Sequence, residues 1–164
     1  MGKESEVAND PSQTGVPTSL LKSRRGFVDR TLAAIERVEG SLASAAPGRQ
    51  RQWLSEVHEA VAALEEAMSD QSSDTDDENG LMAEIERNEP RLSHQVQRLR
   101  REYHELRQQL AALRSQLDPS SQTTPDYAQI RERVGMLLAA VRHYRGREND
   151  LVFEAYEIDL GVGD

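Results

Sequence analysis

A heptad repeat in the second half of the chain limits the possible folds more than any other feature. Its members alternate steps of four and three residues, which places them all on one face of an α-helix. They are Leu92, Val96, Leu99, Tyr103, Leu106, Leu110, Leu113 and Leu117. Pro90 precedes the repeat, and Pro119 and Pro125 follow it. Because proline interrupts a helix, the sequence predicts one long, bounded helix with a single buried face.

Three further segments have a helical period. The first runs from a cap at Thr18 or Ser19 to about Ser44, with Leu21, Phe27, Val28, Leu32, Ile35, Val38 and Leu42 on its apolar stripe. The second carries Trp53, Leu54, Val57, Val61, Leu64 and Met68. The last has Tyr127, Ile130, Val134, Leu137, Val141, Tyr144, Glu148, Leu151, Ala155 and Ile158. A short helical turn is expected at residues 81–88, before Pro90.

Four amphipathic helices with short connections predict an all-α fold, an antiparallel up-down-up-down four-helix bundle. A long dimeric coiled coil would compete, but the prolines interrupt its heptads. We expect the polar residues 1–17 to be a flexible leader and residues 18–164 to form the bundle. The acidic loop at residues 70–78, within the polar stretch 69–80, is expected to be solvated.

Composition excludes several classes of function. Cysteine is absent, so disulfides, thiolate metal sites and cysteine nucleophiles are ruled out. A net charge of −9 argues against a nucleic-acid partner, which requires a concentrated basic surface. No secretory signal or apolar stretch of membrane-spanning length occurs, which predicts a cytoplasmic protein with no membrane partner. The composition indicates no particular oligomeric state.

Polar side chains fall on the apolar stripes of the last two helices. Tyr103 and Tyr144 lie at similar distances in sequence from the turn between those helices, so their phenols should meet in the core. Glu148 lies one turn beyond Tyr144, where an unpaired carboxylate would be costly. Arg24 lies on the stripe of the first helix, whose beginning should adjoin the end of the last. We therefore expect an internal Arg24–Glu148 ion pair, with Glu148 reaching solvent near the bundle end as the alternative.

Several segments resemble divergent bacterial hemerythrin-like (HHE) proteins over about residues 20–164. These are WLSEVHEAVAALEEAM, NGLMAEIERNEPRLSHQVQRLRREYHELRQQL and the closing LLAAVRHYRGRENDLVFEAYEIDLGVGD. The resemblance implies a four-helix bundle that holds two irons with histidine and carboxylate ligands, often for oxygen or redox sensing. The family's Arg-x-Glu-His pattern in the third helix is here Arg101-Glu102-Tyr103, with His104 one place late. In the fourth helix Tyr144 takes the place of the inward histidine, and His143 comes one place early.

The ligand set that this resemblance implies is degenerate. The chain has four histidines, whereas an intact site of this family uses about five. Helical phase directs His94, His104 and His143 to the surface, and only His58 could face inward. The leading interpretation is therefore a filled-in site without a bound cofactor, occupied by a buried polar cluster of Arg24, Tyr103, Tyr144 and Glu148.

Three functions remain open from the sequence. The leading one is a non-enzymatic structural or regulatory bundle on a degenerate dinuclear iron scaffold. The second is an iron-binding or oxygen-sensing protein with the unconventional ligands His58, Tyr103, Tyr144, Glu148 and Asp150. The third is a helical adaptor that docks another protein through the arginine row of the third helix. That row consists of Arg100, Arg107 and Arg114, spaced seven residues apart, and such rows more often form salt bridges to a neighbouring helix.

Overall fold

The chain is mostly helical in the part that the structure describes. The computed structural model describes residues 18–44, 47–121 and 125–161, with side chains up to Tyr156. Its elements are α1 (Thr18–Ala43), α2 (Gln50–Asp70), α3 (Ser72–Asp76), α4 (Leu81–Asn88), the 3₁₀ turn η1 (Pro90–Leu92), α5 (Ser93–Gln116) and α6 (Tyr127–Gly161). These residues include no strand, so the predicted all-α class is confirmed. The predicted leader at 1–17 lies outside the described residues.

Local sequence signals account for the ends of several helices. Gly48 adopts a φ of +84° in the turn between α1 and α2, a conformation that glycine tolerates best. Pro90 ends the predicted short helix α4 and begins η1, from which the heptad helix α5 continues. Asp126 precedes α6, and its Oδ1 atom accepts a hydrogen bond from the backbone N–H of Gln129 at 3.1 Å, as an N-cap does.

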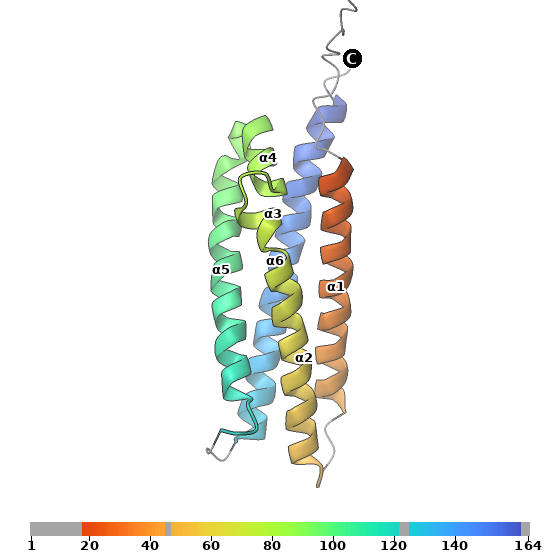
Figure 1. Cartoon of the computed structure of the whole chain (residues 1–164), viewed down its shortest axis with the longest axis vertical. Helices are drawn as coiled ribbons and strands as arrows, with labels where there is room; N and C mark the ends of the chain where they lie inside the picture. The colour runs from red at the N-terminus through yellow and green to blue at the C-terminus, as the bar shows by residue number, and fades with distance from the viewer. Residues whose placement is uncertain (1–17, 45–46, 122–124, 162–164) are drawn as a thin grey trace, which may run out of the picture.

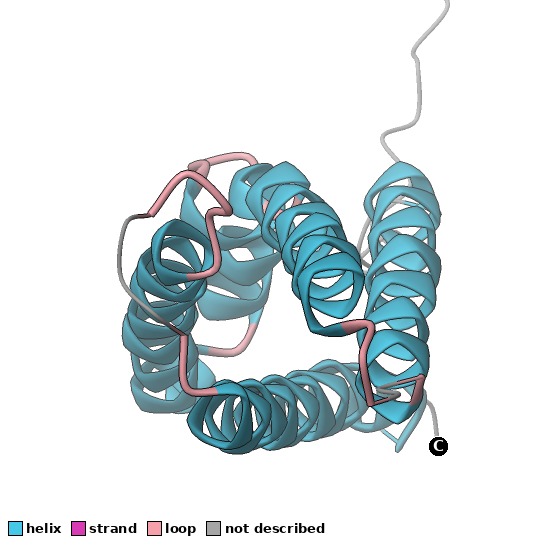
Figure 2. Cartoon of the chain, turned by 90° about the horizontal axis from the view of Figure 1, so that it is seen from below, coloured by secondary structure: helices cyan, strands magenta, loops and turns pink. Residues whose placement is uncertain are grey.

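The four long helices lie side by side along the longest axis of the molecule (Figure 1). α1 packs against α2, α2 against α5, and α5 against α6. Viewed along that axis, the helices surround a common interior (Figure 2). α1 begins and α6 ends at the same end of the molecule, where α3 and α4 also lie (Figure 1). We call this the α3 end.

The core is built from the predicted stripes. All eight residues of the heptad repeat are buried. Trp53 is buried as well, and its indole N–H donates to the carbonyl of Ser41 at 2.9 Å, which ties α2 to α1. One stripe residue was assigned wrongly, because Leu32 is 47% exposed. Thr31, Ala34, Ile35 and Val38 already occupy the narrow face that α1 buries, and Leu32 lies beside that face.

The prediction of a solvated acidic loop was wrong for three residues of that stretch. Residues 72–76 form α3, and Gln71, Asp74 and Thr75 are buried, whereas residues 76–79 are exposed. The chain then turns back at the buried Gly80, where a Cβ atom would lie 2.2 Å from the carbonyl oxygen of Ser73. Only glycine lets the returning chain approach the backbone of α3 so closely. No described helix is long and apolar enough to cross a membrane.

Candidate functional site: a buried polar cluster

Buried polar side chains gather at the α3 end, between α1, α3, α5 and α6. The helices that form the interior bring them together from distant parts of the sequence. We define the polar cluster as Arg24, Gln71, Asp74, Thr75, Tyr103, Tyr144 and Glu148. Buried polar groups need hydrogen-bond or ion-pair partners. The partners of each group determine whether it is still available to bind a ligand or a metal ion.

Glu148 lies at the centre of the cluster and is only 2% exposed. Its Oε1 atom lies 3.4 Å from Nη2 of Arg24, so the two residues form the ion pair that the helical stripes lead one to expect. Its Oε2 atom accepts a hydrogen bond from Nε2 of Gln71 at 2.5 Å. The guanidinium of Arg24 also donates to Asn149. Both oxygens of Glu148 are thus occupied by side chains of this chain.

Tyr103 and Tyr144 meet in the core, with ring centroids 6.1 Å apart and planes inclined by 37°. The Tyr103 hydroxyl donates to the backbone carbonyl of Met68. The Tyr144 hydroxyl is buried beside the Glu148 carboxylate and the Thr75 side chain, but it makes no hydrogen bond of good geometry with a described residue. Burial raises the pKa of Tyr103 to about 12. The pKa of Tyr144 is raised well above its usual value by burial and then by the nearby Glu148 carboxylate. Both phenols therefore stay protonated.

Asp74 is a second buried carboxyl group, 4% exposed, that sequence reasoning missed. Its pKa is raised to about 6, first by burial and then by repulsion from Glu148, while Arg24 acts in the opposite direction. Its Oδ2 atom is buried and has no hydrogen-bond partner among the described residues. Helical periodicity could not reveal Asp74, because it lies in a five-residue helix within a stretch of mostly polar residues.

Two of the candidate ligands lie away from the cluster. His58 is half-buried on α2, ten residues before Met68, which puts it roughly 15 Å along the helix axis from the level of Tyr103. Asp150 is exposed on α6. His94, His104 and His143 are exposed, as helical phase predicted, and Nε2 of His104 lies 2.8 Å from Oδ1 of Asp76.

The arginine row of α5 is engaged within the chain. Nε of Arg100 donates to the carbonyl of Thr75 at 2.8 Å, and its Nη1 lies 3.1 Å from Oε2 of Glu86. Arg107 donates to the Ser69 hydroxyl at 3.0 Å, with its guanidinium 5.7 Å from the centre of the Tyr103 ring. Arg114 pairs with Glu65 of α2 at 3.0 Å. The row therefore joins α5 to its neighbours.

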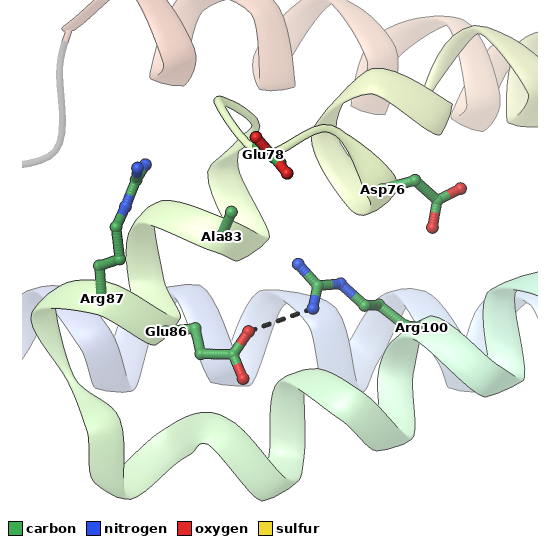
Figure 3. A pocket seen from close by; sticks show the side chains of 6 residues that line it. All are labelled: Asp76, Glu78, Ala83, Glu86, Arg87 and Arg100. Carbon is green, nitrogen blue, oxygen red and sulfur yellow. Dashed lines mark hydrogen bonds and ion pairs between the residues drawn. The ribbon is translucent and has the colours of Figure 1, made fainter.

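An open surface pocket of about 600 Å³ adjoins Arg100 at the α3 end. Figure 3 shows that two of its lining side chains, Arg100 of α5 and Glu86 of α4, point toward one another. Asp76, Glu78, Ala83 and Arg87 complete the lining. Since Arg100 and Glu86 neutralise one another, and Arg87 is paired with Glu84 at 2.6 Å, the pocket presents no concentrated charge of one sign.

The residues that the structure brings together do not fit a dinuclear iron centre of the hemerythrin-like kind. Such a centre needs several imidazoles and free carboxylates, whereas this cluster holds a cation, protonated phenols and Glu148, whose oxygens already accept hydrogen bonds. Among the described residues, no three His, Cys, Asp or Glu side chains are grouped so that they could hold a metal ion.

Comparison with known proteins adds no assignment. The chain matches no family model, no curated protein and no solved structure.

Proposed function

We propose that the chain is a cytoplasmic, non-catalytic structural or regulatory module, an antiparallel up-down-up-down four-helix bundle with a filled-in site of the hemerythrin-like kind. The occupation of both Glu148 oxygens by Arg24 and Gln71 supports this proposal most directly. These two side chains supply the positive charge and the hydrogen-bond donors that a metal ion would otherwise bring to a buried carboxylate. The site then stabilises the bundle and carries out no reaction.

Metal content tests this proposal. The full chain, purified after expression in iron-replete medium, should contain far less than one iron per chain when analysed by inductively coupled plasma mass spectrometry. Its melting temperature should not change when ferrous iron or a chelator is added, because no vacant ligand set is available to bind metal. About two irons per chain would overturn the proposal and favour the iron-binding alternative with Tyr103, Tyr144 and Glu148.

The adaptor alternative rests on Arg100, Arg107 and Arg114. Their contacts with Glu86, Ser69 and Glu65 give each guanidinium a partner within the chain, so we assign the row a structural role. If the row docked another protein, reversing these three charges would abolish capture of that protein while leaving the fold intact. Under our proposal, the same reversal lowers the melting temperature, because it breaks contacts between α5 and α2, α3 and α4.

A further inference from the structure

The short helix α3 is inserted into the end of the bundle by a small number of contacts. Asp74 and Thr75 point inward and are buried. Arg100 of α5 holds the Thr75 carbonyl at 2.8 Å, and the Thr75 hydroxyl donates to the Gln71 carbonyl at 3.4 Å. Behind α3, Gly80 lies against the carbonyls of Ser73 and Asp74. A segment this short, held by few contacts, can open without unfolding of the long helices.

When the Asp74 carboxyl group is ionised, the positive charge near it does not compensate its negative charge and that of Glu148. Arg24 of α1 lowers its pKa, but that guanidinium is already shared between Glu148 and Asn149 of α6. Glu148 repels the Asp74 carboxylate. Arg145 of α6 lies close enough to Glu148 to interact with it, but its guanidinium donates to the Val28 carbonyl at 3.1 Å.

Among the residues that the structure describes, the other elements around α3 offer Asp74 no further cation. Arg100 of α5 is bound to the Thr75 carbonyl and to Glu86 of α4. Arg107 of α5 is bound to Ser69 of α2 and lies over the Tyr103 ring. His104 of α5 pairs with Asp76 on the exposed side of α3. The Asp74 carboxylate thus has one partly engaged cation near it, one repelling anion, and a buried Oδ2 atom without a partner.

We propose that residues 71–80 form a proton-operated latch, closed when the Asp74 carboxyl is protonated and released when it ionises. The protonated carboxyl is neutral, so it tolerates burial beside Glu148. Ionisation favours the open state, in which the carboxylate is hydrated. Opening withdraws Thr75 from Arg100 and Gln71 from Glu148. It therefore exposes the interior of the polar cluster and releases one contact of Arg100, which lines the pocket in Figure 3. The latch supplies the regulatory part of the proposed function with a signal to respond to, a change of pH in the mildly acidic range.

The difference between the pKa values of Asp74 in the closed and open states sets how strongly the opening of α3 depends on pH. The pKa of Asp74 is about 6 in the closed state, against an ordinary value of 3.8 that applies when the latch is open and the carboxyl is hydrated. The equilibrium constant for opening should therefore rise roughly tenfold between about pH 5 and about pH 7.5. Tyr103 and Tyr144 do not titrate in this range, because burial raises the pKa of both phenols.

Amide hydrogen exchange of the full chain, followed by mass spectrometry, tests the latch. The backbone N–H groups of Asp74 and Asp77 donate to the carbonyls of Gln71 and Ser73, so their exchange reports whether α3 is closed. After correction for intrinsic rates, protection in peptides covering residues 71–80 should fall roughly tenfold from about pH 5 to about pH 7.5. Peptides from the middle of α5 should keep their protection at both pH values.

Matched variants separate the carboxyl of Asp74 from a general charge effect. Asp74→Asn should keep residues 71–80 equally protected at both pH values, because its neutral side chain cannot ionise. Asp70→Asn, the same change at an exposed position, should behave as the unmodified chain does. The proposal is overturned if the unmodified chain shows no pH-dependent protection in α3, if α5 loses protection equally, or if Asp74→Asn keeps the pH dependence. Iron content does not affect this measurement. The latch proposal and the proposal of a filled-in metal site can therefore be contradicted independently of one another.

Discussion

Gln71, at the junction of α2 and α3, donates a hydrogen bond to Glu148 of α6 across 77 positions of sequence, with 2.5 Å between Nε2 and Oε2. Arg24 of α1 occupies the other oxygen of the same carboxylate. One side chain thus connects three segments of the chain inside the protein. Hydrogen bonds that involve an ionised group in a buried place contribute more than surface contacts do. Glu148 should therefore be among the most sensitive positions of the fold.

Replacing Glu148 with alanine should lower the free energy of unfolding by about 3–5 kcal/mol. It removes the counter-charge of the half-buried Arg24, which keeps only the neutral Asn149, and it leaves the buried Gln71 amide without its acceptor. Urea unfolding of the two proteins, monitored by circular dichroism, measures the difference. Asp150→Ala removes a carboxylate from an exposed position of the same helix and should change stability by less than about 0.5 kcal/mol. Equal stability of the Glu148 variant and the unmodified chain would show that the carboxylate reaches solvent.

The two core tyrosines should respond differently to removal of their hydroxyls. Tyr103→Phe breaks the hydrogen bond to the Met68 carbonyl and should cost about 1 kcal/mol. Tyr144→Phe removes a buried hydroxyl that lies beside Glu148 and Thr75 but makes no hydrogen bond of good geometry with a described residue, so it should leave stability unchanged or raise it. Thermal unfolding of the two variants side by side makes the comparison. A large loss in Tyr144→Phe would show that this hydroxyl has a partner in solution.

Periodicity predicted most of the buried residues on the long helices. The heptad residues of α5 are buried because their spacing places them all on the one face that packs against the other helices. Tyr103 belongs to this face and therefore meets Tyr144 of α6 in the core. Arg24 and Glu148 could be paired in advance, since each interrupts an apolar stripe at the same end of the molecule. Leu32 shows the limit of this reasoning, because the width of the stripe that a helix buries depends on its neighbours.

The part of the cluster that comes from α3 could not be predicted in this way. Gln71, Asp74 and Thr75 lie among serines and acidic residues, whose composition is typical of a solvated loop. Their burial depends on a chain reversal in which Gly80 touches the backbone of Ser73 and Asp74. Such a close approach is a tertiary contact. In the sequence it is indicated only by a single glycine.

Gly80 should therefore be intolerant of a side chain. In Gly80→Ala the new Cβ atom would lie 2.2 Å from the Ser73 carbonyl oxygen and 2.9 Å from that of Asp74, so the backbone must move. We expect a loss of about 1–3 kcal/mol in the free energy of unfolding. Gly146→Ala is the matched control, because a Cβ atom there meets nothing within 4 Å in the middle of α6. That change should stabilise the protein by about 0.5–1 kcal/mol, since alanine favours the helix. Similar effects at the two glycines would contradict the close packing of α3.

The burial of Asp74 predicts an unusual dependence of stability on pH. Its pKa is about 6 in the folded protein and 3.8 as the ordinary value, so between these values the folded state holds a proton that the unfolded state has released. The contribution of Asp74 to stability is therefore greatest below about pH 4, falls as the pH rises towards 6, and is lowest above that. The total loss is on the order of 3 kcal/mol, and smaller where α3 opens before the whole chain unfolds.

Asp74→Asn isolates this contribution from those of the other acids. Its free energy of unfolding, relative to the unmodified chain, should increase from about pH 4 to about pH 7, because only the unmodified chain must bury a carboxylate beside Glu148 at the higher pH. Urea titrations of both proteins across this range give the difference curve, and Asp70→Asn should give a flat one. A relative stability that stays constant or decreases with pH would mean that Asp74 is ionised and well accommodated in the folded protein, and that its carboxylate is hydrated or paired there.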